Sequence, residues 1–426
     1  MQWGQRAAVV AGFCVGVTGV NPSLAADTSP MPVKAAVQSA DQAWAVSYNS
    51  EVRWFTWTNT RGFPTILAPL SGDGRGSQLY IPMSLSVSGS PNPNWKLEFV
   101  LRGGYVSASQ DTAGNRGSVS TTTDTQASGT ATYNGFTGFQ PFVGLLMNLP
   151  TGKSALYGNS RFARMDSDLV DIGSYGEGWN FGPTAGVNIP ITQALMFTLS
   201  GGYTFRGKYD KESADPITTL ITATDSVKNG DEATVTAALG YSQGPLALQG
   251  SASYSWDGVS EVIGPGANQY RVGPRTTISG SASYAWNDQW SSNANAFWVH
   301  TEKNEVLALG VLVPEGFDTN NDLFRINTGL TYRMANGVST GPIAGFLYRN
   351  RNSWNPATLT FVPAKTRWSA GGMAAYNVTN KISINSRVEK VWINESEFPG
   401  PGAPPSLAPA MSGDAWQLAF GATVNF

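Results

Sequence analysis

The feature that most constrains this chain is a strict alternation of apolar and polar residues, repeated in many stretches from Ala43 onward. Each stretch runs for about 10–14 residues, whereas strands of soluble proteins average about 5–6 and a tilted strand needs about 9–11 to cross a bilayer. One face of segment 246–256 carries Leu246, Leu248, Gly250, Ala252, Tyr254 and Trp256. Its other face carries alanine, glutamine and serines. The alternation predicts strands with one face in lipid and the other in water.

Composition agrees with strands, and not helices, as the elements that cross the membrane. Charged residues make up 13% of the chain, about half of the ~25% usual in soluble proteins. They are replaced by 48 glycines, by small polar residues, and by 14 Trp, 15 Tyr and 19 Phe. No window supplies the ~20 apolar residues of a transmembrane helix. The formal net charge of −2 gives no electrostatic reason to expect a nucleic-acid partner.

Along the chain, a short connection between two of these stretches is followed by a long one, and the order then repeats. Short turns fall at 90–94, 242–244, 286–289, 334–337 and 378–381. The long connections cover residues 60–76, 108–126, 150–178, 209–230, 258–274, 305–321, 351–365 and 395–413. Tight periplasmic turns opposite long external loops are typical of outer-membrane barrels, whose sheet closes because no water satisfies an open edge inside the bilayer.

We therefore predict an all-β fold, a transmembrane antiparallel up-and-down β-barrel of sixteen strands. The strands are expected to begin near residues 43, 77, 95, 127, 140, 179, 195, 231, 245, 275, 290, 322, 338, 366, 381 and 414. An even count with both termini in the periplasm is what a single-chain barrel requires. Fourteen strands is the main alternative, because the first and fourth strands are irregular.

The N-terminal segment 1–25 has the composition of a secretory signal peptide. A positively charged start precedes the apolar stretch AAVVAGFCVGVTGV, and Ser23 and Ala25 then occupy the −3 and −1 positions of a cleavage site. The only cysteine, Cys14, lies in this segment, so we expect no disulfide in the processed chain. Residues 26–42 are expected to form a flexible periplasmic lead, and residues 43–426 the barrel.

The C-terminal segment WQLAFGATVNF alternates in the same way and ends on an aromatic residue. One face carries Trp416, Leu418, Phe420, Ala422, Val424 and Phe426. This segment closely resembles the insertion signal of Gram-negative outer-membrane barrels. The resemblance implies a location in the cell outer membrane. It also implies recognition by the barrel-assembly machinery, which can add such a strand to an exposed sheet edge.

Two further segments resemble narrower groups of these barrels. Residues 138–153, GFQPFVGLLMNLPTGK, resemble the strand-to-loop segment of the barrel family linked to meta-pathway phenol degradation and of related aromatic-transport barrels. Residues 31–35, MPVKA, resemble the mature start of alphaproteobacterial porins. The first group includes transporters of aromatic compounds, and the second consists of porins. Neither resemblance carries a substrate or a binding residue over to this chain.

The alternation places several charged residues on the water-facing side of the strands. The candidate pore-lining residues are Arg102, Arg206, Arg325, Arg333, Arg367 and Arg387, with Glu98 and Glu389. Six arginines against two carboxylates make a basic inner face, which favours anions mildly. The alternative is that the arginines pair with carboxylates and water across a wet lumen.

The third long connection, 150–178, is acidic. Its candidate constriction residues are Asp166, Asp168, Asp171 and Glu177. In general diffusion porins, the loop between the fifth and sixth strands folds into the pore and faces basic residues of the wall. The similar position and charge imply that segment 150–178 narrows the pore here. The alternative is that its aspartates are solvated outside.

No constellation of residues points to catalysis, a cofactor or a metal. His300 is the only histidine, and no serine near it is marked as a nucleophile. No cluster has the spacing of a metal site built from His or Cys. We therefore expect no enzyme activity and no cofactor.

Three functions remain open. The first is an outer-membrane channel for passive diffusion of small hydrophilic solutes, which the polar inner face favours. The second is a transporter for hydrophobic or aromatic compounds, which would need an apolar pocket and an N-terminal plug. The third is a structural or adhesive surface barrel. Outer-membrane lipid is an expected partner of all three, and a homotrimer is compatible because trimers are common among sixteen-stranded porins.

Overall fold

The computed structural model describes most of the expected barrel. It covers residues 44–60, 74–112, 115–213, 223–264, 268–356, 361–399 and 409–426. The expected signal peptide and periplasmic lead lie outside the described residues, as do parts of several external connections. Among the described residues, no helix is long and apolar enough to cross a membrane.

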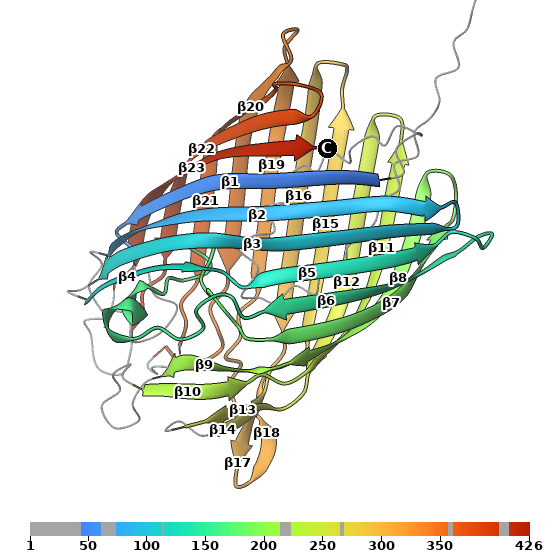
Figure 1. Cartoon of the computed structure of the whole chain (residues 1–426). Coiled ribbons are helices and arrows are strands. Elements are labelled where there is room, and N and C mark those ends of the chain that lie inside the picture. The colour runs from blue at the N-terminus through green and yellow to red at the C-terminus, as the bar shows by residue number, and fades with distance from the viewer. Residues whose placement is uncertain are drawn as a thin grey trace, which may run out of the picture.

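Sixteen long antiparallel strands form one closed barrel, and the first strand pairs with the last (Figure 1). They are β1 (Trp44–Thr58), β2 (Arg75–Asn92), β3 (Trp95–Thr112), β5 (Thr125–Tyr133), β6 (Gln140–Leu149), β7 (Asn180–Pro190), β8 (Leu195–Arg206), β11 (Glu232–Gln243), β12 (Leu246–Asp257), β15 (Arg275–Ala285), β16 (Trp290–Thr301), β19 (Leu323–Arg333), β20 (Val338–Arg349), β21 (Lys365–Asn377), β22 (Ile382–Glu395) and β23 (Met411–Asn425). The sixteen-strand prediction is confirmed, and the fourteen-strand alternative is wrong.

The strand boundaries follow the alternation closely. Each strand begins within three residues of its expected start, and the largest difference is at β23, which begins at Met411 instead of 414. The two strands with an irregular side-chain pattern, β1 and β5, both form. Each pairs with a neighbouring strand along both of its edges. Pairing on both edges satisfies the backbone even where the side-chain pattern is weak.

Two strands that carry nearly the same sequence lie side by side. The segments GSASYSW in β12 and GSASYAW in β15 run antiparallel, so that Gly250 pairs with Gly280 and Leu246 with Tyr284. The Ser251 and Ser279 hydroxyls are 2.7 Å apart on the inner face. The repeat therefore crosses the membrane twice in opposite directions and supplies aromatic rings to both of its edges.

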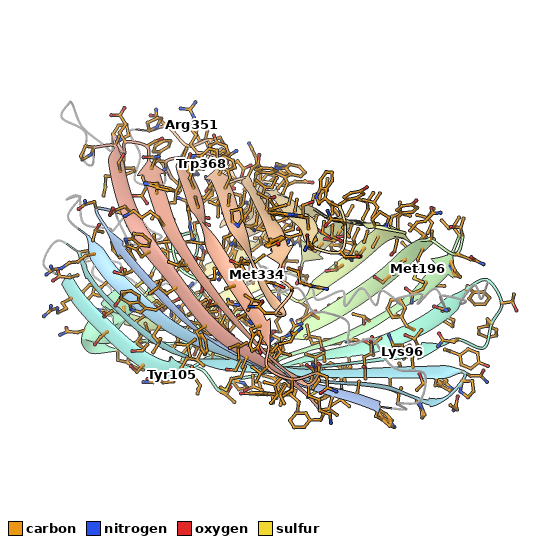
Figure 2. The ribbon with its side chains drawn as sticks, turned by 90° about the horizontal axis from the view of Figure 1, so that it is seen from above. Lys96, Tyr105, Met196, Met334, Arg351 and Trp368 are labelled. Atoms are coloured by element: carbon orange, nitrogen blue, oxygen red, sulfur yellow. The ribbon has the colours of Figure 1, made fainter. Side chains whose placement is uncertain are left out.

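The outer face of the barrel is apolar between two belts of exposed aromatic side chains. Toward the external end, the exposed rings include Tyr203, Phe205, Tyr254, Trp256, Tyr348, Trp368, Trp392 and Trp416. Toward the end with the short turns, they include Trp44, Trp95, Phe136, Phe139, Tyr284, Trp286, Trp290 and Tyr376. Figure 2 shows the side chains around the barrel, with Trp368 among those labelled. Such belts lie at the two membrane–water interfaces.

Three of the expected external loops are partly strands, and this is a correction to the sequence analysis. Together they form a six-stranded external sheet beyond the barrel (Figure 1). Its strands are β9 (Lys208–Ser213), β10 (Ala223–Lys228), β13 (Ser260–Ile263), β14 (Asn268–Arg271), β17 (Glu305–Ala308) and β18 (Val311–Pro314). In addition, β4 (Asn115–Thr122) folds back along β3. Pairing continues past the membrane because it still satisfies the backbone.

The hydrophobic core lies inside the barrel and not between layers. It joins segment 150–178 to the inner faces of neighbouring strands. Its largest members are Phe55, Trp57, Tyr80, Val106, Met165, Leu169, Val170, Ile172, Tyr175, Val391 and Ile393. The segment includes the short 3₁₀ helix η2 (Gly158–Ala163). Because these side chains are buried, the segment has a fixed place against the wall.

Candidate functional site

Segment 150–178, here called the inward-folded loop, is held first by apolar packing. Leu169 is 1% exposed and Val170 is 2% exposed. They belong to the same buried cluster as Phe55 and Trp57, which are inner residues of β1. Burying one large apolar side chain contributes roughly 1.5–3 kcal/mol. The inward-folded loop is therefore part of the inner wall on the side of β1–β3 and β21–β23.

The aspartates of the inward-folded loop face basic residues of the wall. Asp166 Oδ2 lies 2.5 Å from Lys365 Nζ, and Asp168 Oδ2 lies 2.5 Å from Arg349 Nη1. Asp171 Oδ2 lies 3.9 Å from Arg53 Nη1. Burial alone would raise the pKa of the Asp166 carboxyl, but the charges of Lys365 and Arg349 outweigh it and lower the pKa to about 2. Asp166 therefore stays ionised at neutral pH.

Side-chain amides and one carboxylate fix the backbone of the inward-folded loop. Gln78 donates to the carbonyl of Ile172 (2.8 Å) and accepts from its N–H (3.1 Å). Gln110 Nε2 donates to the carbonyl of Arg164 (3.0 Å). Asp124 accepts from the N–H of Gly152 (2.9 Å) and from that of Glu177 (2.8 Å). Both ends of the loop are thus attached to one carboxylate.

The structure places all eight candidate pore-lining residues on the inner face, although in different surroundings. Arg102 and Arg333 are exposed there. Arg367 donates to the carbonyl of Leu169 (3.3 Å) and to Gln417 Oε1 (3.3 Å). Two of the candidates form an ion pair with each other, because Arg387 Nε lies 3.3 Å from Glu389 Oε1. Glu98 pairs instead with a residue outside the candidate set, and its Oε1 lies 2.9 Å from Lys96 Nζ.

Arg325 differs from the exposed Arg102 and Arg333 because it lies next to the inward-folded loop. It lines a small cavity beside the inward-folded loop, together with Ser167, Asp168, Asp171 and Arg367. In the part of the chain that the structure describes, its guanidinium makes no ion pair or hydrogen bond. Arg325 is therefore a cation held next to the loop without a direct carboxylate partner.

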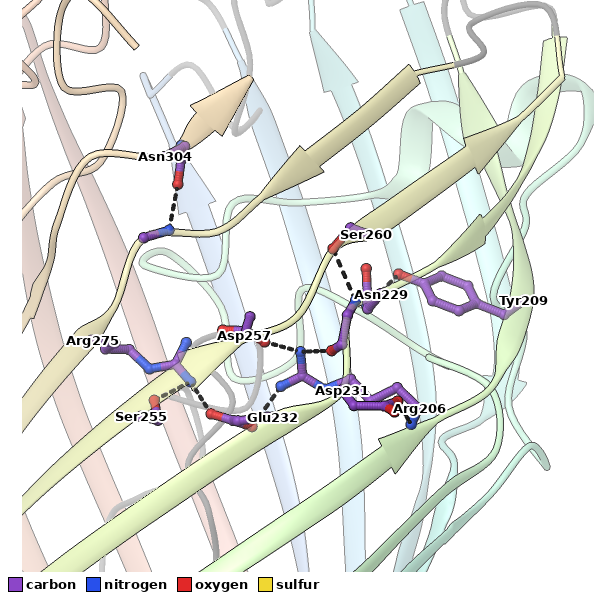
Figure 3. Close-up of polar contacts among 12 residues, drawn as sticks. Arg206, Tyr209, Asn229, Asp231, Glu232, Ser255, Asp257, Ser260, Arg275 and Asn304 are labelled. Carbon is purple, nitrogen blue, oxygen red and sulfur yellow. Dashed lines mark hydrogen bonds and ion pairs between the residues drawn. The ribbon is translucent and has the colours of Figure 1, made fainter. Parts of the chain in front are cut away.

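Arg206, by contrast, belongs to a buried charged quartet of Arg206, Glu232, Asp257 and Arg275 at the external end of the wall (Figure 3). Arg206 Nη2 lies 2.5 Å from Glu232 Oε2, and Arg206 also pairs with Asp257. Arg275 Nη2 lies 2.6 Å from Glu232 Oε1. Two cations face two anions, so Arg206 adds no net charge to the lumen at this level.

The sequence analysis missed several inner charges. These are Glu51, Arg53, Lys96, Glu232, Asp257, Arg275, Arg349, Lys365 and Glu395. Their position in the alternation could have identified them. For example, Lys365 lies two residues before Arg367 and therefore shares its face of the strand. Most of them are the first or last residue of a strand. With them, the named wall residues are eleven cations and six carboxylates, so the inner face stays net basic, and most of its cations have a carboxylate partner.

The rest of the wall has a different chemistry. The inner faces of β5–β8, β11, β12, β15 and β16 carry mainly small polar residues and glycines. Ser281, Ser283 and Asn293 are exposed on this inner face, on the side away from the inward-folded loop. Exposed polar groups on the inside of a closed sheet are typical of a water-filled lumen.

A closed barrel with an apolar outer face between two aromatic belts is the architecture of Gram-negative outer-membrane proteins. This chain is an outer-membrane β-barrel. The C-terminal aromatic residues belong to that outer face, where Trp416, Leu418 and Phe420 are exposed and Val424 pairs with Tyr48 of β1. Phe426 N donates to the carbonyl of Val46 (3.0 Å), which closes the sheet at its periplasmic end.

No family model and no curated protein matches the sequence. Solved outer-membrane barrels have a similar fold. OpdO of Pseudomonas aeruginosa is 10% identical, with 90% of this chain and 97% of that chain covered and a TM-score of 0.42. The Salmonella typhi OmpF complex is 12% identical, with 90% and 97% covered and a TM-score of 0.39. The Pseudomonas putida toluene transporter TodX is 10% identical, with 91% of each chain covered and a TM-score of 0.36. Likenesses this weak carry no argument about a transported compound.

Proposed function

We propose that this barrel is an outer-membrane channel for passive diffusion of small hydrophilic solutes. The observation that supports the proposal is the exposure of polar side chains on the inner face, among them Arg102, Ser281, Asn293 and Arg333. A lumen lined in this way offers hydrogen-bonding partners to water and solute along its length. An apolar pocket for hydrophobic compounds would need open apolar residues, and the inner Phe55 and Trp57 are buried instead.

The inward-folded loop would set the narrowest part of this channel. Its apolar side packs on β1–β3 and β22, and its aspartates pair with β20 and β21. It therefore fills one side of the lumen and leaves the small polar residues of the opposite wall as the passage. We expect the size of a solute to affect its permeation rate more strongly than its charge does.

Charge selectivity should be weak and should favour anions. Most inner charges are paired, and among the described residues Arg102, Arg325, Arg333 and Arg367 are the inner cations that make no ion pair. Of these, Arg367 donates hydrogen bonds to the carbonyl of Leu169 and to Gln417 Oε1. Four cations without carboxylate partners attract anions into the lumen, although salt screens them within about 8–10 Å. The permeability ratio of chloride to potassium should therefore exceed one modestly, and a cation-selective pore would contradict this assignment.

Liposome swelling tests the proposal directly. Proteoliposomes with the purified protein should swell in isotonic solutions of small sugars, with rates that fall as the sugar becomes larger. Protein-free liposomes serve as the control, and uptake of toluene into the same vesicles tests the hydrophobic alternative. Uptake of toluene without sugar-driven swelling would replace the proposal by that alternative. Passage of neither class would favour a surface role for the external sheet.

A further inference from the structure

A cavity of about 380 Å³ lies on the outer surface of the barrel, where the lipid-facing wall meets the external sheet. On its membrane side are Tyr203, Ala233 and Trp256, from β8, β11 and β12. On its external side are the segment 271–274 and the residues Lys303 and Glu305. We call it the outer-rim cavity. Lipid-facing and charged external side chains line the same space here.

The membrane side of the outer-rim cavity continues the external aromatic belt. Tyr203 is 41% exposed and Trp256 is 44% exposed. The Tyr203 hydroxyl donates to Asp231 Oδ2 (3.3 Å), which orients the ring at the edge of the cavity. Tyrosine and tryptophan in such belts lie at the level of lipid headgroups, with the ring body in the apolar layer. The cavity therefore opens at headgroup depth.

The acidic groups that line the cavity already have partners. Asp257 pairs with Arg206 of the charged quartet, and Asp231 Oδ1 accepts from the N–H of Arg206 (2.9 Å). Glu305 Oε2 lies 2.8 Å from Arg271 Nη1, and the Arg271 side chain is still 42% exposed. The Asp257 and Glu305 carboxylates are therefore each neutralised by an arginine, whereas Asp231 is held by the Tyr203 hydroxyl and a backbone N–H.

Lys303 is the cation of this cavity that no carboxylate neutralises. Its Nζ donates to the carbonyl of Gly316 (3.1 Å), and among the described residues it makes no ion pair. The backbone around it is fixed, because Gly273 N donates to Asn304 Oδ1 (3.0 Å) and joins the two external segments (Figure 3). The charged quartet adjoins the cavity through Asp257, which is one of its lining residues. The same cavity is therefore lined by an ammonium group without a carboxylate partner and by the aromatic rings of Tyr203 and Trp256.

We propose that the outer-rim cavity binds the phosphate-bearing headgroup of an outer-leaflet lipid. Lys303 and the exposed part of Arg271 would bind the phosphate by charge-assisted hydrogen bonds. Trp256 and Tyr203 would contact the apolar part of the same molecule. The lipid-facing position of the cavity points to a lipid and not to a solute of the lumen, and the proposal does not depend on what the channel transports.

The test uses the full-length protein in dodecyl maltoside micelles and measures binding of diphosphorylated lipid A by native mass spectrometry. Lys303→Ala and Arg271→Ala should each weaken binding about five-fold, which is the effect of one basic side chain beside an anionic lipid surface. Lys303→Glu should weaken it further. Lys228→Ala is the matched control, because Lys228 is exposed on β10 but lies outside the cavity. The heat-dependent mobility of the folded barrel in electrophoresis confirms that each variant is folded.

Two comparisons decide the chemistry. Dephosphorylated lipid A should bind weakly to the wild type, and equal binding of both forms would overturn the role of the phosphate. Inorganic phosphate at millimolar concentration should not displace the lipid, and displacement would show a simple anion site instead of a lipid site. Equal binding of lipid A to the wild type and to both alanine variants would also overturn the proposal.

Discussion

Asp124, in the turn between β4 and β5, is the residue that fixes both ends of the inward-folded loop. Besides the N–H groups of Gly152 and Glu177, it accepts from Asn148 Nδ2 (2.7 Å). Hydrogen bonds to a charged group contribute about 1.5–3 kcal/mol each. Asp124→Ala should therefore destabilise the closed loop by about 3 kcal/mol, visible as faster amide exchange across residues 150–178. Asp124→Asn should have a smaller effect, and unchanged exchange in the alanine variant would contradict this role.

Lys365 is buried between Asp166 and Glu395, with its Nζ 2.9 Å from Glu395 Oε1. Lys365→Met would remove the cation between two buried carboxylates and leave Asp166 with Arg349, 3.5 Å away, as its remaining basic neighbour. Removing one member of a buried ion pair costs about 3–5 kcal/mol. We expect a loss of that order in the free energy of unfolding, measured by urea titration in lipid vesicles. Lys228→Met, on the exposed face of β10, is the matched control and should leave the stability unchanged.

The same ion pair predicts a narrow pH dependence. Because the pKa of folded Asp166 is about 2, below its ordinary value of 3.8, its contribution to stability is complete above about pH 4 and is lost as the pH falls toward 2. The part of the loop-dependent conductance that Asp166 controls should be constant from pH 7 to about pH 4 and should change below it. Asp166→Asn should lose this transition, and the same transition in that variant would assign it to another group.

At the scale of elements, β23 has two roles that one experiment can separate. It closes the barrel by pairing with β1 and β22, and we propose that its aromatic end is read by the barrel-assembly machinery. Deleting Phe426 removes a single backbone hydrogen bond, worth about 1 kcal/mol. Refolding in detergent should therefore remain nearly normal, whereas the amount of folded barrel in cells should fall strongly. Equal losses in both assays would mean that Phe426 acts only through stability.

The elements also show how far the sequence could predict this fold. The alternation identified every spanning strand. It missed the external sheet, because strands of four residues such as β13 and β14 are too short to show a period. It located the acidic loop but not its partners Arg53, Arg349 and Lys365. Which wall a loop contacts depends on the closed barrel, and that is a tertiary property.

At the scale of the whole molecule, the barrel has two unequal inner walls. One wall is covered by the inward-folded loop, whose contacts are apolar on one side and ionic on the other. The opposite wall carries exposed Ser281, Ser283 and Asn293. This asymmetry is the basis of the proposed channel, because the loop limits the passage and the polar wall hydrates it. An outer surface that binds lipid phosphate would keep the external sheet near the membrane without entering the pore.

Single-channel conductance in planar bilayers tests this account most directly. The variant replaces residues 160–172 of the inward-folded loop by a short glycine–serine segment, and the control shortens the external hairpin of β17 and β18, which lies outside the barrel. We predict discrete ohmic conductance in the wild type, a clearly larger conductance in the loop variant, and no change in the control. A loop variant with wild-type conductance, or a wild type without conductance, would contradict the account.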